Sequence, residues 1–267
     1  MASRTKKAQR AFSEKDVKAA RKAHSRAKIK ADLQEDHQAE SAQYLGEFVY
    51  GAIDGSVTTF AVVAGATGAA LNPLIVIILG FANLIADGFS MACGAFLNEK
   101  TQSEYIAKER AREEWEVDNV PEGEREEIRE IFSKKGFKGK DLEKAVKIIT
   151  SNKKVWVDTM MADELGLLES AKSPWKAALT TFFGFLVIGV IPLLAYVLAY
   201  FFTFFQNNTF KIAIVMTAFA MAAIGYIKHH VTKANITRSI METLFIGGAA
   251  AIIAYYIGFF LRWIVTV

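Results

Sequence analysis

The sequence predicts an all-α membrane protein with five transmembrane helices and a helical domain inserted between the second and third. A helix needs about 20 mostly apolar residues to cross a bilayer, and five stretches of the 267-residue chain are long and apolar enough. Charged residues are concentrated in two other segments, and the second of these carries helix start and stop signals. These observations favour a membrane bundle with an inserted, water-exposed domain.

The charge distribution separates the water-exposed segments from the membrane segments. Residues 1–43 hold 11 Lys or Arg and 6 Asp or Glu, residues 98–175 hold 15 and 18, and the rest of the chain holds only 6 and 4. The formal net charge of +4 averages over these segments and does not indicate nucleic-acid binding. The single cysteine, Cys93, excludes a disulfide framework within one chain, and we expect it to be a small buried side chain.

The predicted spans cover residues 47–70, 73–97, 177–205, 212–227 and 240–265. Short connectors at 71–72 and 206–209 make spans one and two, and spans three and four, antiparallel neighbours. Nearly all Lys and Arg fall on one side if the N-terminal tail, the insert and the loop before span five lie in the cytoplasm. The positive-inside rule therefore predicts a cytosolic N-terminus and insert, with the C-terminus on the opposite side.

The chain is predicted to divide into a basic cytosolic tail (1–45), spans one and two (46–97), a cytosolic helical insert (98–175) and spans three to five (176–267). In the tail, Lys15, Lys18, Lys22 and Arg26 would share one face of a helix. Such a face can lie on anionic lipid headgroups, and a solvated helix or disordered arm is the alternative.

The insert is expected to form four helical segments. The first continues span two without Gly or Pro as far as Val120-Pro121. The other three cover residues 124–134, 141–150 and 153–165.

Asp54 is the first candidate site residue, because a carboxylate in the middle of a spanning helix costs about 2.5 to 3.5 kcal/mol on insertion scales and is seldom present without a function. Gly51 and Gly55 flank it with the spacing that lets helices approach closely. Glu47 lies two turns earlier on the same face, at the expected cytoplasmic mouth. The alternatives are a protonated packing carboxyl at Asp54 and an ordinary interfacial anion at Glu47.

In span two, Asn83, Asp87 and Met91 recur every four residues and form one stripe with an amide, a carboxyl and a thioether. This composition is unusual for lipid contact. Opposite Asp54, the oxygen and sulfur atoms would replace part of the hydration shell of a metal ion. Met91 alone is more typical of core packing.

The insert carries a second set of candidate ligands. Glu109, Glu113 and Glu116 share one helical face, Glu124 and Glu127 share another, and Met160, Met161 and Glu164 lie within about one turn. Carboxylates with this spacing repel one another unless a cation neutralises them. Taken separately, these features are better explained by a solvated helix with paired arginines and by a methionine core. A metal site requires that the two sets converge.

Walker A, G-x-S-x-G and H-E-x-x-H motifs are absent from the sequence. Phosphate-driven pumping within this chain and hydrolytic chemistry therefore have no support. We expect a protein that is not an enzyme.

The most specific motifs of the chain are YGAIDGSVT in span one, ADGFSMACGAFL in span two, WVDTMMADELGL at the end of the insert, GVIPLLAY in span three and RSIMETLFIGG in span five. These motifs resemble the vacuolar iron transporter family, whose members exchange Fe(II), often also Mn(II), for protons. The resemblance extends from about Gly46 to the last span. It implies a metal-binding insert and a homodimer whose translocation path lies between the first two spans of both subunits.

By position, the resemblance assigns pathway ligands to Asp54 and Met91, and an acidic cytoplasmic position to Glu47. In the insert it assigns metal ligands to Glu113, Glu116, Glu124, Glu127, Met160, Met161 and Glu164. Some members carry a Glu in span two where this chain has Asn83, and Asp87 follows one turn later. Either Asp87 supplies the proton-linked carboxyl, or coupling rests on Asp54 and Glu47.

The resemblance implies a proton-coupled antiporter that exports Fe(II), with Mn(II) or other divalent metals as further substrates, from the cytosol across a vacuolar or plasma membrane. The expected partners are metal ions, protons, lipid and a second copy of the chain, and neither nucleic acid nor a prosthetic group is expected. Zn(II) is a further candidate ligand of the insert. The alternatives are a membrane-tethered metal sensor or buffer without transport, and a structural adaptor that docks partners.

Overall fold

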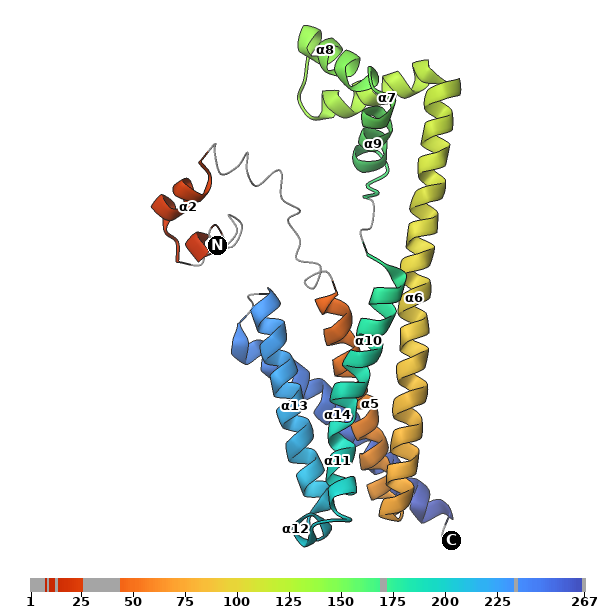
Figure 1. Ribbon diagram of the computed structural model, residues 1–267, viewed down its shortest axis with the longest axis vertical. Coiled ribbons are helices and arrows are strands. Elements are labelled where there is room, and N and C mark those ends of the chain that lie inside the picture. Colours follow the sequence, from red (N-terminus) through yellow and green to blue (C-terminus); the bar gives the residue numbers. More distant parts are fainter. Residues whose placement is uncertain are drawn as a thin grey trace. The chain divides into compact units, whose positions relative to one another are not determined.

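The structure, a computed structural model, describes residues 8, 10–12, 14–25, 44–168, 172–232 and 235–265. Every regular element in these residues is a helix (Figure 1), so the predicted all-α class is confirmed for them. The chain forms two compact units, Met1–Gly46 and Glu47–Val267.

The first unit contains the short helix α2 (Val17–Ala23). Asp16 caps this helix by accepting hydrogen bonds from the backbone N–H groups of Lys18 (2.9 Å) and Ala19 (3.0 Å). Lys15 precedes the cap with a left-handed φ of 51°. The predicted basic helical face is therefore wrong at Lys15, because the helix begins only after Asp16, and Arg26 lies outside the described residues.

Five helical spans are long and apolar enough to cross a membrane, which confirms the predicted number. They are α5 (Leu45–Gly68), α6 (Pro73–Asn119), α10 (Pro174–Gly189) together with α11 (Ile191–Leu198), α13 (Thr209–Thr232) and α14 (Ile236–Val265). Figure 1 shows their membrane-spanning parts as one bundle.

The third span differs from the single helix expected over residues 177–205. α10 ends at Gly189 and α11 begins at Ile191, because Pro192 lacks the N–H group that would continue the backbone ladder. α11 ends at Leu198. The backbone is then extended at Phe202, and the short α12 (Thr203–Gln206) lies in the connection to α13.

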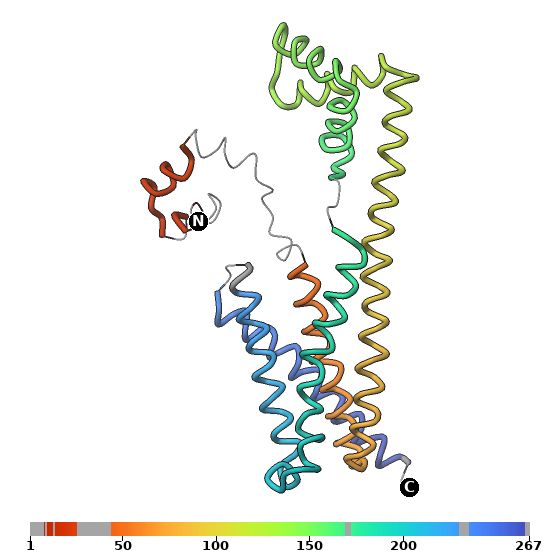
Figure 2. Tube along the Cα trace, viewed as in Figure 1, coloured from red at the N-terminus to blue at the C-terminus, as the bar shows by residue number. Residues whose placement is uncertain are grey.

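The insert begins as a direct continuation of span two. α6 is one 47-residue helix, about 70 Å long at 1.5 Å per residue. Three further helices follow, α7 (Pro121–Lys134), α8 (Gly139–Thr150) and α9 (Lys153–Asp163). The trace in Figure 2 shows this part folding back before the chain returns to α10. The four helical segments predicted for the insert are confirmed.

The insert has its own apolar core. Its buried members are Ile106, Val117, Ile128, Val146, Trp156, Val157, Met160 and Met161. Ion pairs also join the helices: Arg129 and Glu143 link α7 to α8 (3.0 Å), and Lys153 and Asp118 link α9 to α6 (2.5 Å). Since such partly exposed pairs contribute at most about 1 kcal/mol each, the shared core is the main connection between these helices.

α5 packs against its neighbours by direct backbone contact. A Cβ atom added to Gly51 would lie 2.2 Å from the carbonyl oxygen of Thr181, and one added to Gly55 would lie 2.4 Å from that of Phe185, both on α10. On α14, a Cβ at Gly258 would lie 2.0 Å from the carbonyl oxygen of Gly65. The G-x-x-x-G spacing around Asp54 therefore serves the contact with α10.

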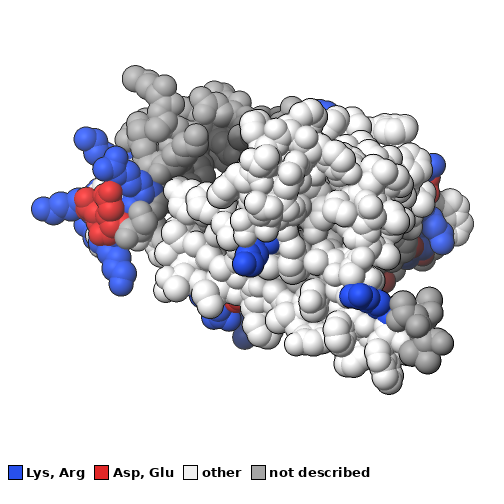
Figure 3. Space-filling model, turned by 90° about the horizontal axis from the view of Figure 1, so that it is seen from below, with Lys and Arg blue, Asp and Glu red and all other residues white. Residues whose placement is uncertain are grey.

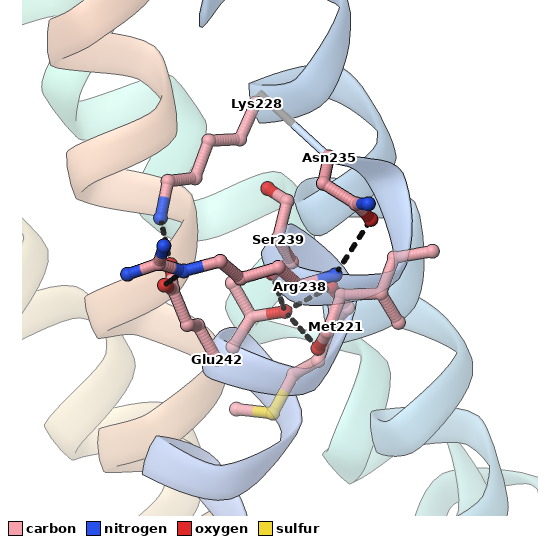
Figure 4. A network of polar contacts seen from close by, with 8 residues as sticks. Met221, Lys228, Asn235, Arg238, Ser239 and Glu242 are labelled. Carbon is pink, nitrogen blue, oxygen red and sulfur yellow. Dashed lines mark hydrogen bonds and ion pairs between the residues drawn. The ribbon is translucent and has the colours of Figure 1, made fainter. Parts of the chain in front are cut away.

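A polar network joins α13 to α14 near their connecting loop (Figure 4). Glu242 accepts hydrogen bonds from Lys228 (2.8 Å) and Arg238 (2.9 Å), and the Thr243 hydroxyl donates to the carbonyl oxygen of Met221 (3.1 Å). These bonds fix the hairpin of the last two spans. The sequence interpretation did not single out Glu242.

The end of the bundle at which α12 lies carries few charges. Figure 3 shows this end as a broad surface of uncharged side chains with scattered Lys and Arg. The contrast with the highly charged insert is the asymmetry on which the predicted topology rests.

The backbone contact predicts that even a methyl group at Gly55 is destabilising. Gly55→Ala places a Cβ 2.4 Å from the carbonyl oxygen of Phe185, and such overpacking costs about 1 to 3 kcal/mol. Thermal unfolding of the purified protein in detergent is expected to show a lower midpoint. Gly94→Ala is the matched control, because no heavy atom lies within 4 Å of its added Cβ. Equal midpoints for the two variants would contradict this packing.

Candidate metal centre

Two carboxylates of the insert are buried at the edge of its apolar core. Glu113 is 1% exposed and lies on the same side of α6 as Val117, and Glu124 is 6% exposed and lies on the same side of α7 as Ile128. In the described part of the chain, neither oxygen of Glu113 has a hydrogen-bond partner, and nor does Oε2 of Glu124. A buried carboxylate in this state requires a cation or a proton to neutralise it.

Five carboxylates that the sequence singled out come together here. One oxygen from each of Glu113, Glu116 and Glu124 lies within 4.8 Å of the other two. Glu127 and Glu164 interact electrostatically with the same group. We call these five residues the acidic cluster. Glu113 and Glu124 form its buried side, Glu116 is half-buried, and Glu127 and Glu164 are exposed. The carboxylates of the two predicted sets therefore lie near one another, which spacing alone left open.

The two buried carboxyls of the acidic cluster have pKa values near neutral pH. Burial raises the pKa of Glu113 to about 7, against the opposing charge of Arg112 and with the help of neighbouring carboxylates. Burial likewise raises the pKa of Glu124 to about 7, and Glu127 adds to the rise. A divalent ion that binds here must displace protons around neutral pH.

Arg112 is part of this site, although the sequence interpretation connected it only with the alternative of a solvated helix. Its guanidinium contacts Glu109 at 3.0 Å and Glu116 at 2.6 Å. Its Nη2 also lies 2.7 Å from Glu113 Oε1, outside hydrogen-bonding geometry. Glu109 is therefore paired with Arg112. The three- and four-residue spacings from Arg112 are the signal that reveals these pairs.

The two methionines of the insert are buried in its core. Met160 is 0% exposed and Met161 is 3% exposed, both within the apolar cluster that includes Ile128. The backbone N–H of Glu164 donates to the carbonyl oxygen of Met160 (3.0 Å), so the methionines and a carboxylate of the acidic cluster lie on successive turns. Their packing role is shown, and a role as soft ligands stays a prediction.

The membrane candidates lie on neighbouring parts of α5 and α6. The carboxylates of Asp54 and Asp87 are close enough to interact electrostatically. Asn83, Asp87 and Met91 are all half-buried on one side of α6. Nδ2 of Asn83 is buried without a hydrogen-bond partner among the described residues, and Met91 packs against the core of the bundle. The stripe predicted in span two therefore faces protein in part and leaves the rest of its surface uncovered within one chain.

Glu47, in the first turn of α5, is held by a distant residue. Lys172 Nζ lies 2.6 Å from Glu47 Oε1, and the Glu47 side chain is 15% exposed. Lys172 comes just before α10, 125 positions later in the chain. Nothing in the local sequence predicts this ion pair.

Cys93 is exposed, so the expectation of a buried side chain is wrong. It lines an apolar groove of about 460 Å³ between α6 and α10, with Phe89 and Trp175 among the other lining residues. The reason is its position two residues after Met91, which places it away from the side of α6 that carries the polar stripe.

Comparison with known proteins confirms the resemblance expected from the motifs. The model of the VIT family matches residues 45–259. The chain is 34% identical over 268 residues to the vacuolar iron transporter of Toxoplasma gondii, covering 97% of this chain and 89% of that protein. It is 34% identical over 225 residues to vacuolar iron transporter 1 of Arabidopsis thaliana, covering 82% and 88%. It is 30% identical to the vacuolar iron transporter of Plasmodium falciparum, covering 97% of both chains. These relatives are named as transporters and not as enzymes.

The acidic cluster predicts a metal affinity that depends on its buried carboxylates. Glu124→Gln removes one charged donor and is expected to weaken Mn(II) binding to the full chain by about tenfold or more, measured by calorimetry in detergent. Glu130→Gln is the control, because Glu130 lies on the same helix but is 65% exposed and pairs with Lys134. Equal affinities for the two variants would remove Glu124 from the ligand set.

The raised pKa values predict how the stability of the metal-free insert depends on pH. The pKa of Glu113 is about 7 in the folded chain, against an ordinary value of 4.5 for an unfolded chain. Between these two pH values the folded state binds more protons than the unfolded state, so the folded state loses stability as the pH rises. Glu113→Gln is neutral at every pH. It is expected to stabilise the insert at pH 8 by on the order of 2 kcal/mol and to change little at pH 4.5.

Hydrogen–deuterium exchange of α7 and α9 in the full chain, corrected for the intrinsic exchange rate, measures this difference. Faster exchange in Glu113→Gln than in the wild type at pH 8 would mean that the Glu113 charge is stabilised by the fold.

Proposed function

Because the chain belongs to the VIT family, we propose that it is a proton-coupled antiporter that exports Fe(II) from the cytosol, with Mn(II) and other divalent transition metals as further substrates. Its broader assignment, a multi-pass membrane protein of metal-ion transport, rests on the family and on the five spans. The observation that carries the finer proposal is a pair of buried carboxylates without full hydrogen bonding. Glu113 lies on the helix that carries Asp87 and Met91, and Glu124 lies on α7.

The acidic cluster would capture the ion. Carboxylate oxygens supply the charge that a divalent cation requires, and the sulfur atoms of Met160 and Met161 favour softer transition metals. Exposed Glu127 and Glu164 would meet the ion first, and Glu113, Glu116 and Glu124 would complete its coordination. Zn(II) fits the same donors, so binding of Zn(II) to the insert does not establish its transport.

Glu47, Asp54 and Met91 would form the path through the membrane. Glu47 and Asp54 share one side of α5, and Asp54 lies near Asp87 on α6. A membrane carboxyl rarely faces lipid, yet Asn83, Asp87 and Met91 remain half-exposed in a single chain. A second copy would cover this stripe, so the path lies between the subunits of a homodimer.

Protons would release the ion on the far side. A protonated carboxyl attracts a cation far less than a carboxylate does. Protonation of Asp54, Asp87 or Glu47 from an acidic exterior or organelle lumen therefore weakens coordination and favours release. The positive-inside rule supports export from the cytosol, because it puts the N-terminus and the insert on the cytosolic side of the membrane. That membrane would be a vacuolar or plasma membrane.

Transport across a sealed membrane tests the role of Asp54. Asp54→Asn keeps the size of the side chain and removes its charge, so Mn(II) flux in proteoliposomes is expected to fall by at least tenfold. Asp141→Asn, an exposed carboxylate of the insert, is the matched control and is expected to retain wild-type flux. Wild-type flux in Asp54→Asn would contradict its role in the path.

A pH gradient tests proton coupling and separates transport from sensing. Fe(II) and Mn(II) flux is expected to rise several-fold when the face opposite the insert is acidic, and to be accompanied by proton movement in the reverse direction. Flux that does not depend on the pH gradient would indicate another coupling ion. Binding of metal without flux would favour a membrane-tethered sensor or buffer.

A further inference from the structure

We propose that Lys172 is a counter-ion of Glu47 at the cytoplasmic mouth of the membrane path. Its ammonium group pairs with the Glu47 carboxylate until a metal ion displaces it. The inference rests on the proposed function, because it assigns a metal ion as the competitor of the lysine. It adds a positioning residue that tunes the entry of metal into the membrane path.

The geometry of the pair shows that Lys172 is the cation that neutralises Glu47. The ammonium lies 2.6 Å from Glu47 Oε1. The second oxygen, Oε2, is buried and has no hydrogen-bond partner among the residues that the structure describes. A carboxylate this far removed from solvent requires a positive charge nearby, and Oε2 remains available to a second cation.

Lys172 is also joined through the chain to the acidic cluster. It lies only eight positions after Glu164, in the connection between α9 and α10. The same segment therefore carries a cluster carboxylate at one end and the counter-ion of the mouth at the other.

The lysine is the movable member of the pair. Glu47 stands on α5, which is fixed against α10 by the backbone contacts of Gly51 and Gly55. The Lys172 side chain is 34% exposed, and its flexible four-carbon stem lets the ammonium leave without a change in the helices. A divalent ion brings twice the charge to the same carboxylate, so it competes with the lysine.

Transport kinetics test this competition. Without the tethered cation, Lys172→Gln is expected to lower the KM for Mn(II) in proteoliposomes by about three- to tenfold, with no increase in the maximal rate. Lys172→Arg keeps the charge and is expected to stay within about twofold of the wild type. Lys176→Gln, which removes a lysine one turn later, is the matched control. A raised or unchanged KM in Lys172→Gln would overturn the proposal and leave the pair as a structural contact.

The action of Lys172 through Glu47 is tested by the double variant. In a Glu47→Gln background, Lys172→Gln is expected to leave the KM unchanged, because the shared carboxylate is gone. An equal decrease in both backgrounds would mean that the lysine acts elsewhere, and it would overturn the proposal. Wild-type kinetics in Glu47→Gln alone would instead remove Glu47 from the path and contradict that part of the proposed function.

A measurement that needs no transport separates the two proposals. Acetylation of lysines in the purified full chain, followed by mass spectrometry, reports whether the Lys172 ammonium is paired. Saturating Mn(II) is expected to raise its reactivity about three- to tenfold, with Lys100 as an exposed reference. In Glu47→Gln without metal, Lys172 is expected to be more reactive than in the metal-free wild type. If Mn(II) leaves Lys172 protected in the wild type, displacement does not occur, whether or not the protein transports metal.

Discussion

Backbone contact between α5 and α10 is the constraint on which the rest of the structure depends. Lipid supplies no hydrophobic force that drives helices together, so close approach at small residues has to hold the bundle. At Gly51 and Gly55 the carbonyl oxygens of α10 occupy the space that any side chain would need. This contact sets the position of α5, and with it the positions of Glu47 beside Lys172 and of Asp54 near Asp87.

Several carboxyl groups of this protein lie where the fold itself does not fully neutralise or hydrogen-bond them. Glu113 and Glu124 are buried without full hydrogen bonding, and Asp54 and Asp87 bring two carboxyls together inside an apolar bundle. Each arrangement is unfavourable for the protein alone and becomes favourable when a cation or a proton arrives. The long α6 connects the two places, because Glu113 lies near one end of the helix that carries Asp87. A carrier of divalent metal and protons fits this pattern.

Much of this architecture is visible in the sequence, because periodicity and composition are local signals. The run from residue 98 to Asn119 without Gly or Pro predicts the continuous α6. The family resemblance assigns Glu113, Glu116 and Glu124 as ligands, although their spacing alone does not show that they come together. Features that depend on tertiary contact are not visible. The pairing of Glu47 with Lys172 spans 125 positions, and the exposure of Cys93 depends on which side of α6 meets the bundle. The break of the third span at Pro192 is, by contrast, a local signal that the sequence interpretation missed.

The central claim is that one divalent ion meets carboxylate and thioether groups first in the insert and then in the membrane. Crystals of the full chain grown with Mn(II), measured at the manganese absorption edge, test this claim most directly through anomalous difference density. The account predicts one peak within coordination distance of Glu113, Glu116 and Glu124, and another between Asp54 and Met91. Saturating Mn(II) that produced peaks elsewhere and none at these residues would contradict it.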